Sequence, residues 1–223
     1  MKLLFRDNFK RAPTAIGASW DDDAASSANP VVAATLADSA DDTKTMRMAN
    51  GSITGATRPN LVVMATTQLG VGPRLQGLGG CYQTITVDYP MTCHLGLCLI
   101  NSTPVANPDG IWGGIDESGE LITWTCQKRV LAGGAAEIFG GSAADVALLG
   151  GVPTSVRIGM GFRRAMGGGA HIWLDLNGRR LGDVVDVSYD DPALIGAMRP
   201  GISTDVHSGA GRIHEYALYG LRY

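Results

Sequence analysis

The sequence has no long apolar run, few aromatic residues and no excess of positive charge. No stretch of about 18 consecutive apolar residues occurs in the 223 residues, so no segment is a candidate transmembrane helix. Aromatic residues make up 6% of the chain, and the formal net charge is -3 with acidic and basic residues interspersed. Because binding to phosphates needs an extended positive surface, we do not expect a nucleic acid as a partner. Because there is no long apolar span, we do not expect a membrane as a partner either.

The sequence pattern also lacks a secretion signal. Arg6, Asp7 and Asn8 interrupt the opening apolar residues before a signal core of the usual length could form. We therefore expect the chain to be made in the cytoplasm of its host, without an export signal of its own.

The four cysteines do not have the Cys-x-x-Cys spacing of common zinc or redox motifs. They are Cys81, Cys93, Cys98 and Cys126. If residues 91–100 form a strand, Cys93 and Cys98 face opposite sides of the sheet and cannot bridge each other. We expect free, mostly buried thiols. A zinc site that includes His94 beside Cys93 is the alternative, but no second pair of ligands is visible. No metal or other cofactor is predicted.

Glycine, in contrast, is abundant, with 31 residues, and strand patterns recur between turn signals. Residues 60–69, 82–89 and 91–100 are rich in apolar or β-branched side chains, which favours strands. The alternation in residues 91–100 predicts a core face that consists of Met91, Cys93, Leu95, Leu97 and Leu99. A first strand over residues 2–9 would place Leu3, Phe5 and Phe9 on one face. A closing strand from Arg212 would do the same for Ile213, Ala217, Tyr219 and Leu221.

Two further segments predict strands and a hairpin. In residues 156–162, the alternation predicts one face of Val156, Ile158, Met160 and Phe162 and another of Arg157, Gly159, Gly161 and Arg163. Asn177-Gly178 is typical of a type I′ turn, which would place Leu174 opposite Leu181 and Asp175 opposite Arg180. The three glycines at 167–169 are expected to form a hairpin tip, since the residues that follow a phosphate-binding loop are missing.

Other segments are less regular. Residues 116–119 have the composition of a turn between two strands. Residues 21–60 predict long loops with short strands between them, and residues 131–151 predict a short helix or a loop packed over a sheet edge. With no repeat or linker, we expect one domain over residues 1–223, with ten to fourteen strands in two packed sheets.

The opening segment resembles the start of concanavalin A-like (laminin-G-like) jelly-roll domains. The residues that carry this resemblance are Asp7, Phe9, Arg11, Ile16, Gly17 and Trp20. The strand at 156–162, the Asn-Gly hairpin, the segment 200–204 and the last strand are also similar to that family. The resemblance implies an all-β, two-sheet antiparallel sandwich whose first and last strands are neighbours. Such domains occur in lectins, glycan-cleaving enzymes and bacteriophage virion proteins, and the resemblance transfers no catalytic residue.

Acidic residues are the first candidates for catalysis, because a glycosidic bond is cleaved between two carboxyl groups about 5 Å apart in retaining enzymes. Asp116, Glu117 and Glu120 come closest in sequence, but a turn there would splay their side chains into water. Asp175 with Trp173 on the same strand face could hold a sugar ring. The alternative is an exposed ion pair between Asp175 and Arg180.

The remaining candidates lack a motif. The histidines His94, His171, His207 and His214 are scattered, and Asp21, Asp22 and Asp23 lack the spacing of a calcium loop. Trp112, Trp124 and Trp173 are candidates for stacking on a sugar. No catalytic residue, ligand-binding residue or metal ligand is therefore assigned.

These observations favour a non-enzymatic bacteriophage virion structural protein, either a capsid decoration (cement) protein or a tail-associated protein. Its expected partners are neighbouring capsid or tail subunits, and a homotrimer is the expected symmetric assembly. The alternatives are a carbohydrate-binding module and a glycan-cleaving enzyme of the same fold.

Overall fold

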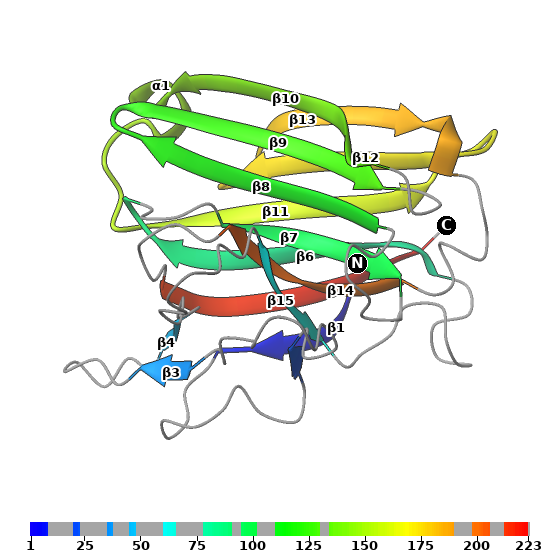
Figure 1. The fold of residues 1–223 in the computed structure, drawn as a ribbon, viewed down its shortest axis with the longest axis horizontal. Helices are drawn as coiled ribbons and strands as arrows, with labels where there is room; N and C mark the ends of the chain where they lie inside the picture. The colour runs from blue at the N-terminus through cyan, green and yellow to red at the C-terminus, as the bar shows by residue number, and fades with distance from the viewer. Residues whose placement is uncertain are drawn as a thin grey trace.

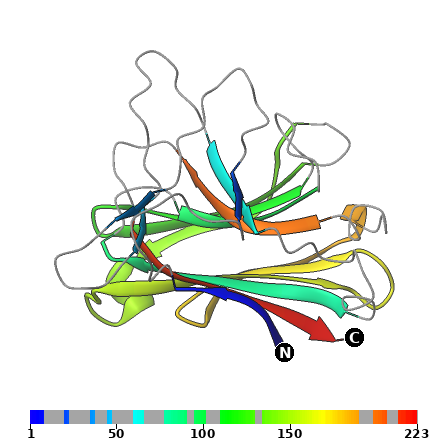
Figure 2. The same ribbon diagram turned by 90° about the horizontal axis from the view of Figure 1, so that it is seen from below.

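In the computed structural model, two antiparallel sheets pack face to face (Figure 2). The structure describes residues 1–8, 20–22, 35–37, 45–47, 60–65, 78–90, 95–101, 110–129, 134–189, 198–205 and 212–222. Apart from one short α-helix, α1 (Asp145–Leu149), and one 3-10 turn, η1 (Val187–Tyr189), the regular structure of these residues is all β, as expected.

Sheet A has eight strands (Figure 1). Its order is β13 (Arg179–Asp186), β12 (Ala170–Leu176), β11 (Ser155–Arg164), β6 (Leu78–Asp88), β15 (Arg212–Arg222), β4 (Thr45–Arg47) and β3 (Thr35–Ala37), while β1 (Lys2–Asp7) also pairs with β15. Sheet B has seven strands. Its order is β10 (Ala136–Ala144), β9 (Leu121–Arg129), β8 (Gly110–Ser118), β7 (Leu95–Asn101), β14 (Met198–Asp205), β5 (Asn60–Ala65) and β2 (Trp20–Asp22).

The first and last strands lie side by side, as the resemblance implied (Figure 2). The predicted face of the first strand was wrong, however. A register shift between Leu3 and Phe5 leaves Leu3 50% exposed, while Leu4 and Phe5 pack against the core. Such a bulge adds one residue to a strand and exchanges the faces of the residues beyond it.

The core lies between the sheets, where the inner faces of their strands meet. β11 confirms its predicted alternation: Val156, Ile158, Met160 and Phe162 are buried in the core. β7 confirms it for Leu97 and Leu99, whereas Met91 and Cys93 lie outside the described residues. In β15, Ile213 lies in the core as predicted. A register shift between Ile213 and Glu215 then puts Tyr216 and Leu218 in the core, so Ala217 and Tyr219 were predicted on the wrong face.

The Asn-Gly hairpin is confirmed, with positive φ values of 52° at Asn177 and 83° at Gly178. Both values fit a type I′ turn, which few other residues adopt without strain. Asp175 lies opposite Arg180 as predicted. Leu174, however, lies opposite Gly182 and not Leu181, because the register shifts by one residue between Leu174 and Asp175.

Two other turn predictions have different outcomes. The three glycines at 167–169 lie between β11 and β12 and all have positive φ, so the predicted hairpin tip is confirmed. The predicted turn at 116–119 was too long. β8 continues to Ser118, and only Gly119 and Glu120 form the turn to β9.

Residues 131–151 contain a strand that the sequence did not predict. β10 pairs with β9 and forms the edge of sheet B, and α1 follows it directly. The short strands β2, β3 and β4 confirm that residues 21–60 contain brief strands, and they raise the number above the expected ten to fourteen. Phe9, Arg11, Ile16 and Gly17 lie outside the described residues.

Candidate functional site

A row of aromatic side chains crosses the outer face of sheet A. Tyr219 of β15 lies opposite Tyr82 of β6, which lies opposite Gly161 of β11, which in turn lies opposite Trp173 of β12. The ring centroids of Tyr82 and Tyr219 are 6.2 Å apart. Those of Tyr82 and Trp173 are also 6.2 Å apart, with their planes only 13° from parallel. We call Tyr219, Tyr82 and Trp173 the aromatic row.

Glycine in β11 makes this row possible. A Cβ atom at Gly161 would lie 1.9 Å from Cε2 of Trp173, so the indole ring lies directly over the Gly161 backbone. Tyr82 and Trp173 therefore approach each other across an intervening strand. The alternation of residues 156–162 places Gly161 on the outer face, but the sequence alone did not reveal what covers it.

Asp175 is part of the same surface but is not available as an exposed ligand. Only 4% of the residue is exposed, and its carboxylate accepts a hydrogen bond from the Tyr82 hydroxyl at 2.8 Å and one from the Gly178 N–H at 3.2 Å. Burial raises the pKa of Tyr82 above its ordinary value, and the neighbouring negative charge of Asp175 raises it further.

Arg180 does not form the expected ion pair with Asp175. Its guanidinium Nη1 lies 2.8 Å from the Asp183 carboxylate, and its Cζ lies 4.9 Å from the centroid of the Trp173 ring. The register that opposes Asp175 and Arg180 is right, but Asp175 turns toward Tyr82 and Arg180 turns toward the indole. His171 hydrogen-bonds with the same Asp183 and lies 5.3 Å from Trp173 between ring centroids.

The aromatic row thus combines three rings with a guanidinium group that lies over the indole of Trp173 and an imidazole beside it. All three rings are half-buried, so part of each ring remains accessible. Aromatic rings of this kind bind flat apolar surfaces, including the faces of sugar rings. The hydrogen bond between Tyr82 and Asp175 holds Tyr82 in a fixed position. Sequence reasoning found Trp173 and Asp175 but missed Tyr82 and Tyr219, because their contact depends on the order of the strands.

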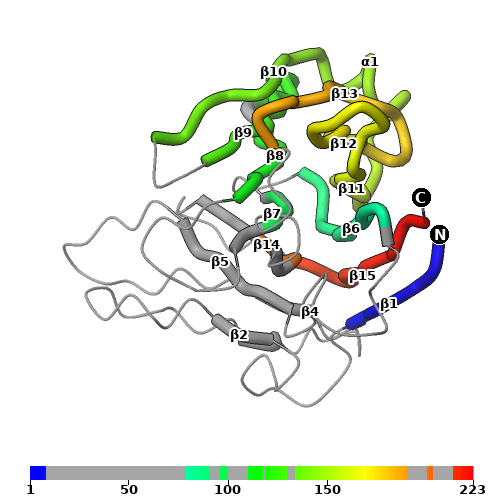
Figure 3. The backbone as a smooth tube through the Cα atoms, turned by 90° about the vertical axis from the view of Figure 1, so that its right-hand side faces the viewer, coloured from blue at the N-terminus to red at the C-terminus, as the bar shows by residue number. Residues whose placement is uncertain are grey.

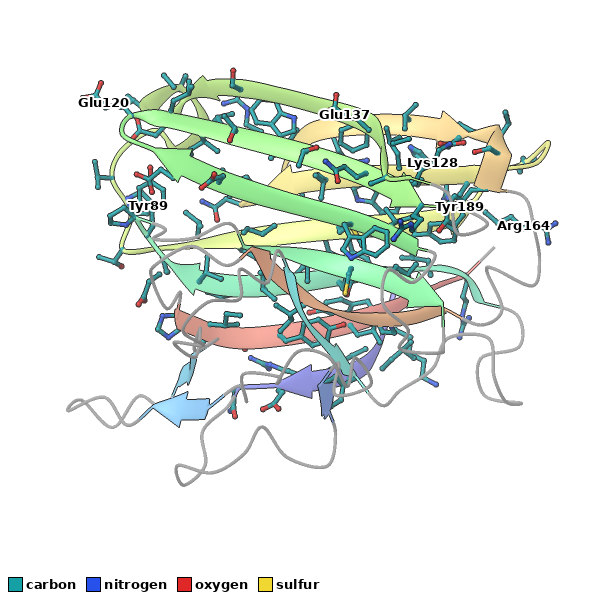
Figure 4. The ribbon with its side chains drawn as sticks, in the orientation of Figure 1. Tyr89, Glu120, Lys128, Glu137, Arg164 and Tyr189 are labelled. Atoms are coloured by element: carbon teal, nitrogen blue, oxygen red, sulfur yellow. The ribbon has the colours of Figure 1, made fainter. Side chains whose placement is uncertain are left out.

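The three acidic candidates do not converge on one point. Asp116 and Glu117 are successive residues of β8, so their side chains leave opposite faces of sheet B. Glu120 lies in the exposed turn at one end of the sandwich (Figure 4). Burial raises the pKa of Tyr89, which lies at the same end, and so does the nearby charge of Glu117. The Tyr89 hydroxyl donates a hydrogen bond to Asp145 at 3.2 Å, the N-terminal residue of α1.

The three tryptophan candidates have different environments. Trp124 packs against the core, and its ring lies 2.6 Å from where a Cβ atom of Gly141 would be. Its ring faces the interior between the sheets, although the residue is half-buried like the other two tryptophans. Trp112 lies on the outer face of sheet B, since its neighbours Ile111 and Gly113 face the core side. Trp112 and Trp173 remain as candidates for stacking on a ligand.

The predicted free thiols are confirmed for Cys81, Cys98 and Cys126, which are all buried. Burial raises the pKa of both Cys81 and Cys126 to about 12. His214 hydrogen-bonds with Asp88, far from His171. Cys93, His94, His207 and Asp23 lie outside the described residues, while Asp21 and Asp22 belong to β2.

A polar cluster, which we call the charged clasp, joins the two sheets at the opposite end from Glu120 (Figure 4) and consists of Lys128, Asp186 and Ser188. Lys128 of β9 contacts the carboxylate of Asp186 in β13 and the hydroxyl of Ser188. Burial tends to raise the pKa of Asp186, but the hydrogen bonds from Lys128 and Ser188 outweigh it and hold the pKa below its ordinary value. We interpret the clasp as a structural link between β9 and β13.

The described residues contain neither a group of metal-binding side chains nor a membrane-spanning helix. Among these residues, no three histidine, cysteine or acidic side chains are grouped closely enough to hold a metal ion. No helix in this part of the chain has the length and apolar character needed to span a membrane.

Comparison with solved structures identifies the fold as the concanavalin A-like sandwich. The carbohydrate recognition domain of Emp47p matches with a TM-score of 0.57 and 8% identity, over 99% of this chain and 97% of that one. SCLam, a non-specific endo-beta-1,3(4)-glucanase from family GH16, matches with a TM-score of 0.61 and 9% identity, over 99% and 91%. At such identities these similarities establish the fold alone.

A third solved structure comes from a bacteriophage. The CBM2 module of the evolved Dit protein of Lactobacillus casei BL23 phage J-1 has a TM-score of 0.54 and 5% identity, over 97% of this chain and 94% of the module. No protein-family model and no curated protein sequence matches the chain. The fold is therefore one that lectins, glycoside hydrolases and a phage carbohydrate-binding module share.

Proposed function

We propose that this chain is a non-enzymatic structural protein of a bacteriophage virion, displayed on the capsid as a decoration protein or associated with the tail. The observation that carries the proposal is the similarity to a phage Dit module over nearly the full length of both chains. In this function the protein binds neighbouring virion subunits through its exposed strand edges and outer sheet faces.

The positions of the acidic side chains support the non-enzymatic part of the proposal. Asp116 and Glu117 leave opposite faces of sheet B, and Asp175 belongs to the other sheet, where Tyr82 and Gly178 occupy its carboxylate. A pair of carboxyl groups that flank one glycosidic bond would need to face a common space.

Mass spectrometry of purified virions tests the proposal directly. We expect peptides of this chain in gradient-purified particles, at a copy number comparable to that of other structural subunits. The purified protein should also co-sediment with empty capsids or with isolated tails. Absence from the particles, or no binding to either part, would show that the protein is not a virion component.

Carbohydrate binding at the aromatic row is the second candidate function. The specific observation in its favour is the nearly parallel pair of Tyr82 and Trp173 on an outer face. A glycan array followed by titration calorimetry tests it, with Trp173→Ala as the variant and Trp112→Ala as the matched control on the other sheet. Glycan binding that only Trp173→Ala abolishes would establish the aromatic row as a sugar site. Binding that survives Trp173→Ala would contradict it.

A further inference from the structure

The two sheets have edge strands of opposite character on the same side of the sandwich (Figure 3). β13, the edge of sheet A, has four charged side chains and a bulge, features that protect natural edge strands from pairing with other chains. β10, the edge of sheet B, has a single charged residue, Glu137, near its start (Figure 4). From Phe139 to Ala144 it is uncharged and keeps a regular register with β9.

The alternating hydrogen bonds show which backbone groups of β10 face away from β9. The N–H of Asp145 donates to the carbonyl of Glu120 at 2.9 Å. In an antiparallel pair, opposed residues alternate between hydrogen-bonded and non-hydrogen-bonded positions. Counting back from Asp145, the residues whose N–H and C=O groups point to the open edge are Gly140, Ser142 and Ala144. All three residues are exposed, and the carboxylate of Glu137 lies over Gly140, 3.1 Å from where its Cβ atom would be.

The backbone groups on this edge can form hydrogen bonds with the same groups of a second copy of the chain. A second β10, related by a two-fold axis through Ser142, would place Ser142 opposite the partner's Ser142 and Gly140 opposite the partner's Ala144. Each opposed pair can then exchange both of its N–H···O hydrogen bonds. The side chains of the opposed residues are small and uncharged, and the nearest charged group is the carboxylate of Glu137 beside Gly140.

Exposed apolar side chains flank the same segment. Leu121 of β9, which lies opposite Ala144, is 43% exposed, and Val146, two residues after Ala144, is 62% exposed. Association along β10 would bring these side chains toward the first residues of the partner's β10. Removal of their surface from water would add to the hydrogen bonds of the edge.

We infer that β10 is a self-association edge, at which two copies of this chain pair in antiparallel fashion about Ser142 and make their seven-stranded sheets continuous. This inference goes beyond the proposed function, because the partner is a second copy and not another virion protein. It also assigns a two-fold contact in place of the trimer expected from the sequence.

Light scattering coupled to size exclusion tests this edge with variants of one residue. We expect the wild-type chain to have twice its monomer mass of 23.3 kDa. Ser142→Pro removes only an N–H that points away from β9, so the fold should survive while the dimer is lost. Ser142→Lys should also give a monomer, because two like charges then face each other. Ser142→Thr is the matched control and should remain a dimer. A monomeric or trimeric wild type, or a dimer that survives Ser142→Pro, would overturn the inference.

Disulfide cross-linking tests the register of the pairing. Opposed residues of a hydrogen-bonded pair have Cα atoms about 5.5 Å apart, which a disulfide can span. Ser142→Cys should therefore give a cross-linked dimer on mild oxidation. Thr123→Cys, opposite Ser142 on the inner neighbour β9, and Val185→Cys, on the other edge strand, are the controls. Equal cross-linking in either control, or none at Ser142→Cys, would contradict this register. Both tests need only the purified chain, so their outcome is independent of the virion experiments.

Discussion

Two successive residues of β6 take part in polar contacts on opposite faces of sheet A. Gln83 points inward and is 0% exposed: it accepts a hydrogen bond from the Tyr216 hydroxyl at 3.0 Å and donates one to the Cys98 carbonyl at 2.8 Å. Tyr82 points outward and donates to Asp175 at 2.8 Å. The inner contacts join β15 and β6 of sheet A to β7 of sheet B, whereas the outer contact stays within sheet A.

The comparison shows that a side-chain hydrogen bond can stabilise the packing of the two sheets or fix the position of a ring on the protein surface. A buried amide costs free energy unless both its N–H and its carbonyl have partners, so the inner network fixes how the two sheets sit against each other. The outer pair holds a tyrosine ring beside a tryptophan ring on a face that other molecules can reach. We therefore expect inner substitutions to change stability and outer substitutions to change mainly the surface.

The largest effect is expected from the inner network. Gln83→Ala removes a buried side chain, leaves a cavity and removes the hydrogen bonds with the Tyr216 hydroxyl and the Cys98 carbonyl. We expect the free energy of unfolding to fall by about 3–5 kcal/mol, measured by urea denaturation. Gln83→Met keeps most of the volume and should cost about 1–3 kcal/mol. A loss well under about 1 kcal/mol for Gln83→Ala would mean that the network does not hold the sheets together.

A smaller decrease in the free energy of unfolding is expected at Gly161, where the indole ring of Trp173 packs against the backbone. Gly161→Ala places a Cβ atom 1.9 Å from Cε2 of Trp173, so the indole ring must move. We expect a loss of about 1–3 kcal/mol, together with a change in tryptophan fluorescence. Gly151→Ala is the control, since a Cβ atom there has nothing within 4 Å. An unchanged fluorescence spectrum in Gly161→Ala would contradict the position of the ring.

Asp175→Asn should have a still smaller effect on stability. The amide keeps one acceptor for Tyr82 but loses the negative charge. We expect the free energy of unfolding to fall by about 1–2 kcal/mol. Because the charge of Asp175 adds to the effect of burial on Tyr82, the pKa of Tyr82 should fall toward its ordinary value but stay above it. Ultraviolet titration of tyrosinate measures this shift. Asp116→Asn, in β8 of the other sheet, should leave the Tyr82 titration unchanged.

The inner thiols should affect stability only in alkaline solution. Burial raises the pKa of Cys81 and Cys126 from 9.0 to about 12 in the folded chain. Well below pH 9.0 each thiol is protonated in both states and does not contribute to the pH dependence. Between pH 9.0 and about 12 the unfolded chain loses these protons while the folded chain keeps them, so the free energy of unfolding should fall. Denaturation curves across this range that show no fall would contradict the burial of the thiols.

Much of the fold could be predicted from alternation and turn chemistry. The faces of β11 and the Asn177-Gly178 turn needed only the period of two along a strand and the two residues that tolerate positive φ. The faces of β1 and β15 were wrong because each contains a bulge, and no residue pattern marks where an extra residue enters a strand. β10 was missed because its glycine and alanine residues have low strand propensity, and only its pairing with β9 holds it extended.

The aromatic row was predictable only in part. The spacing of Trp173 and Asp175 by two residues places them on one face, and the structure confirms this. Their partner Tyr82 is 91 residues before Trp173, and Tyr219 is 46 residues after it. That these residues lie close together in space follows only from the strand order, in which β15, β6, β11 and β12 are neighbours in sheet A. The open edge of β10 was hidden for the same reason, since an edge is defined by the strands around it.

The position of β15 inside sheet A has a consequence for biosynthesis. β15 lies between β6 on one side and β1 and β4 on the other, so β1 and β4 can join sheet A only after β15 has been synthesised. Until residues 212–222 emerge, the nascent chain has an unfilled slot in the middle of the sheet, and contacts of such long sequence separation form slowly. A truncation that removes residues 212–222 would therefore take an interior strand out of sheet A, together with the buried Tyr216.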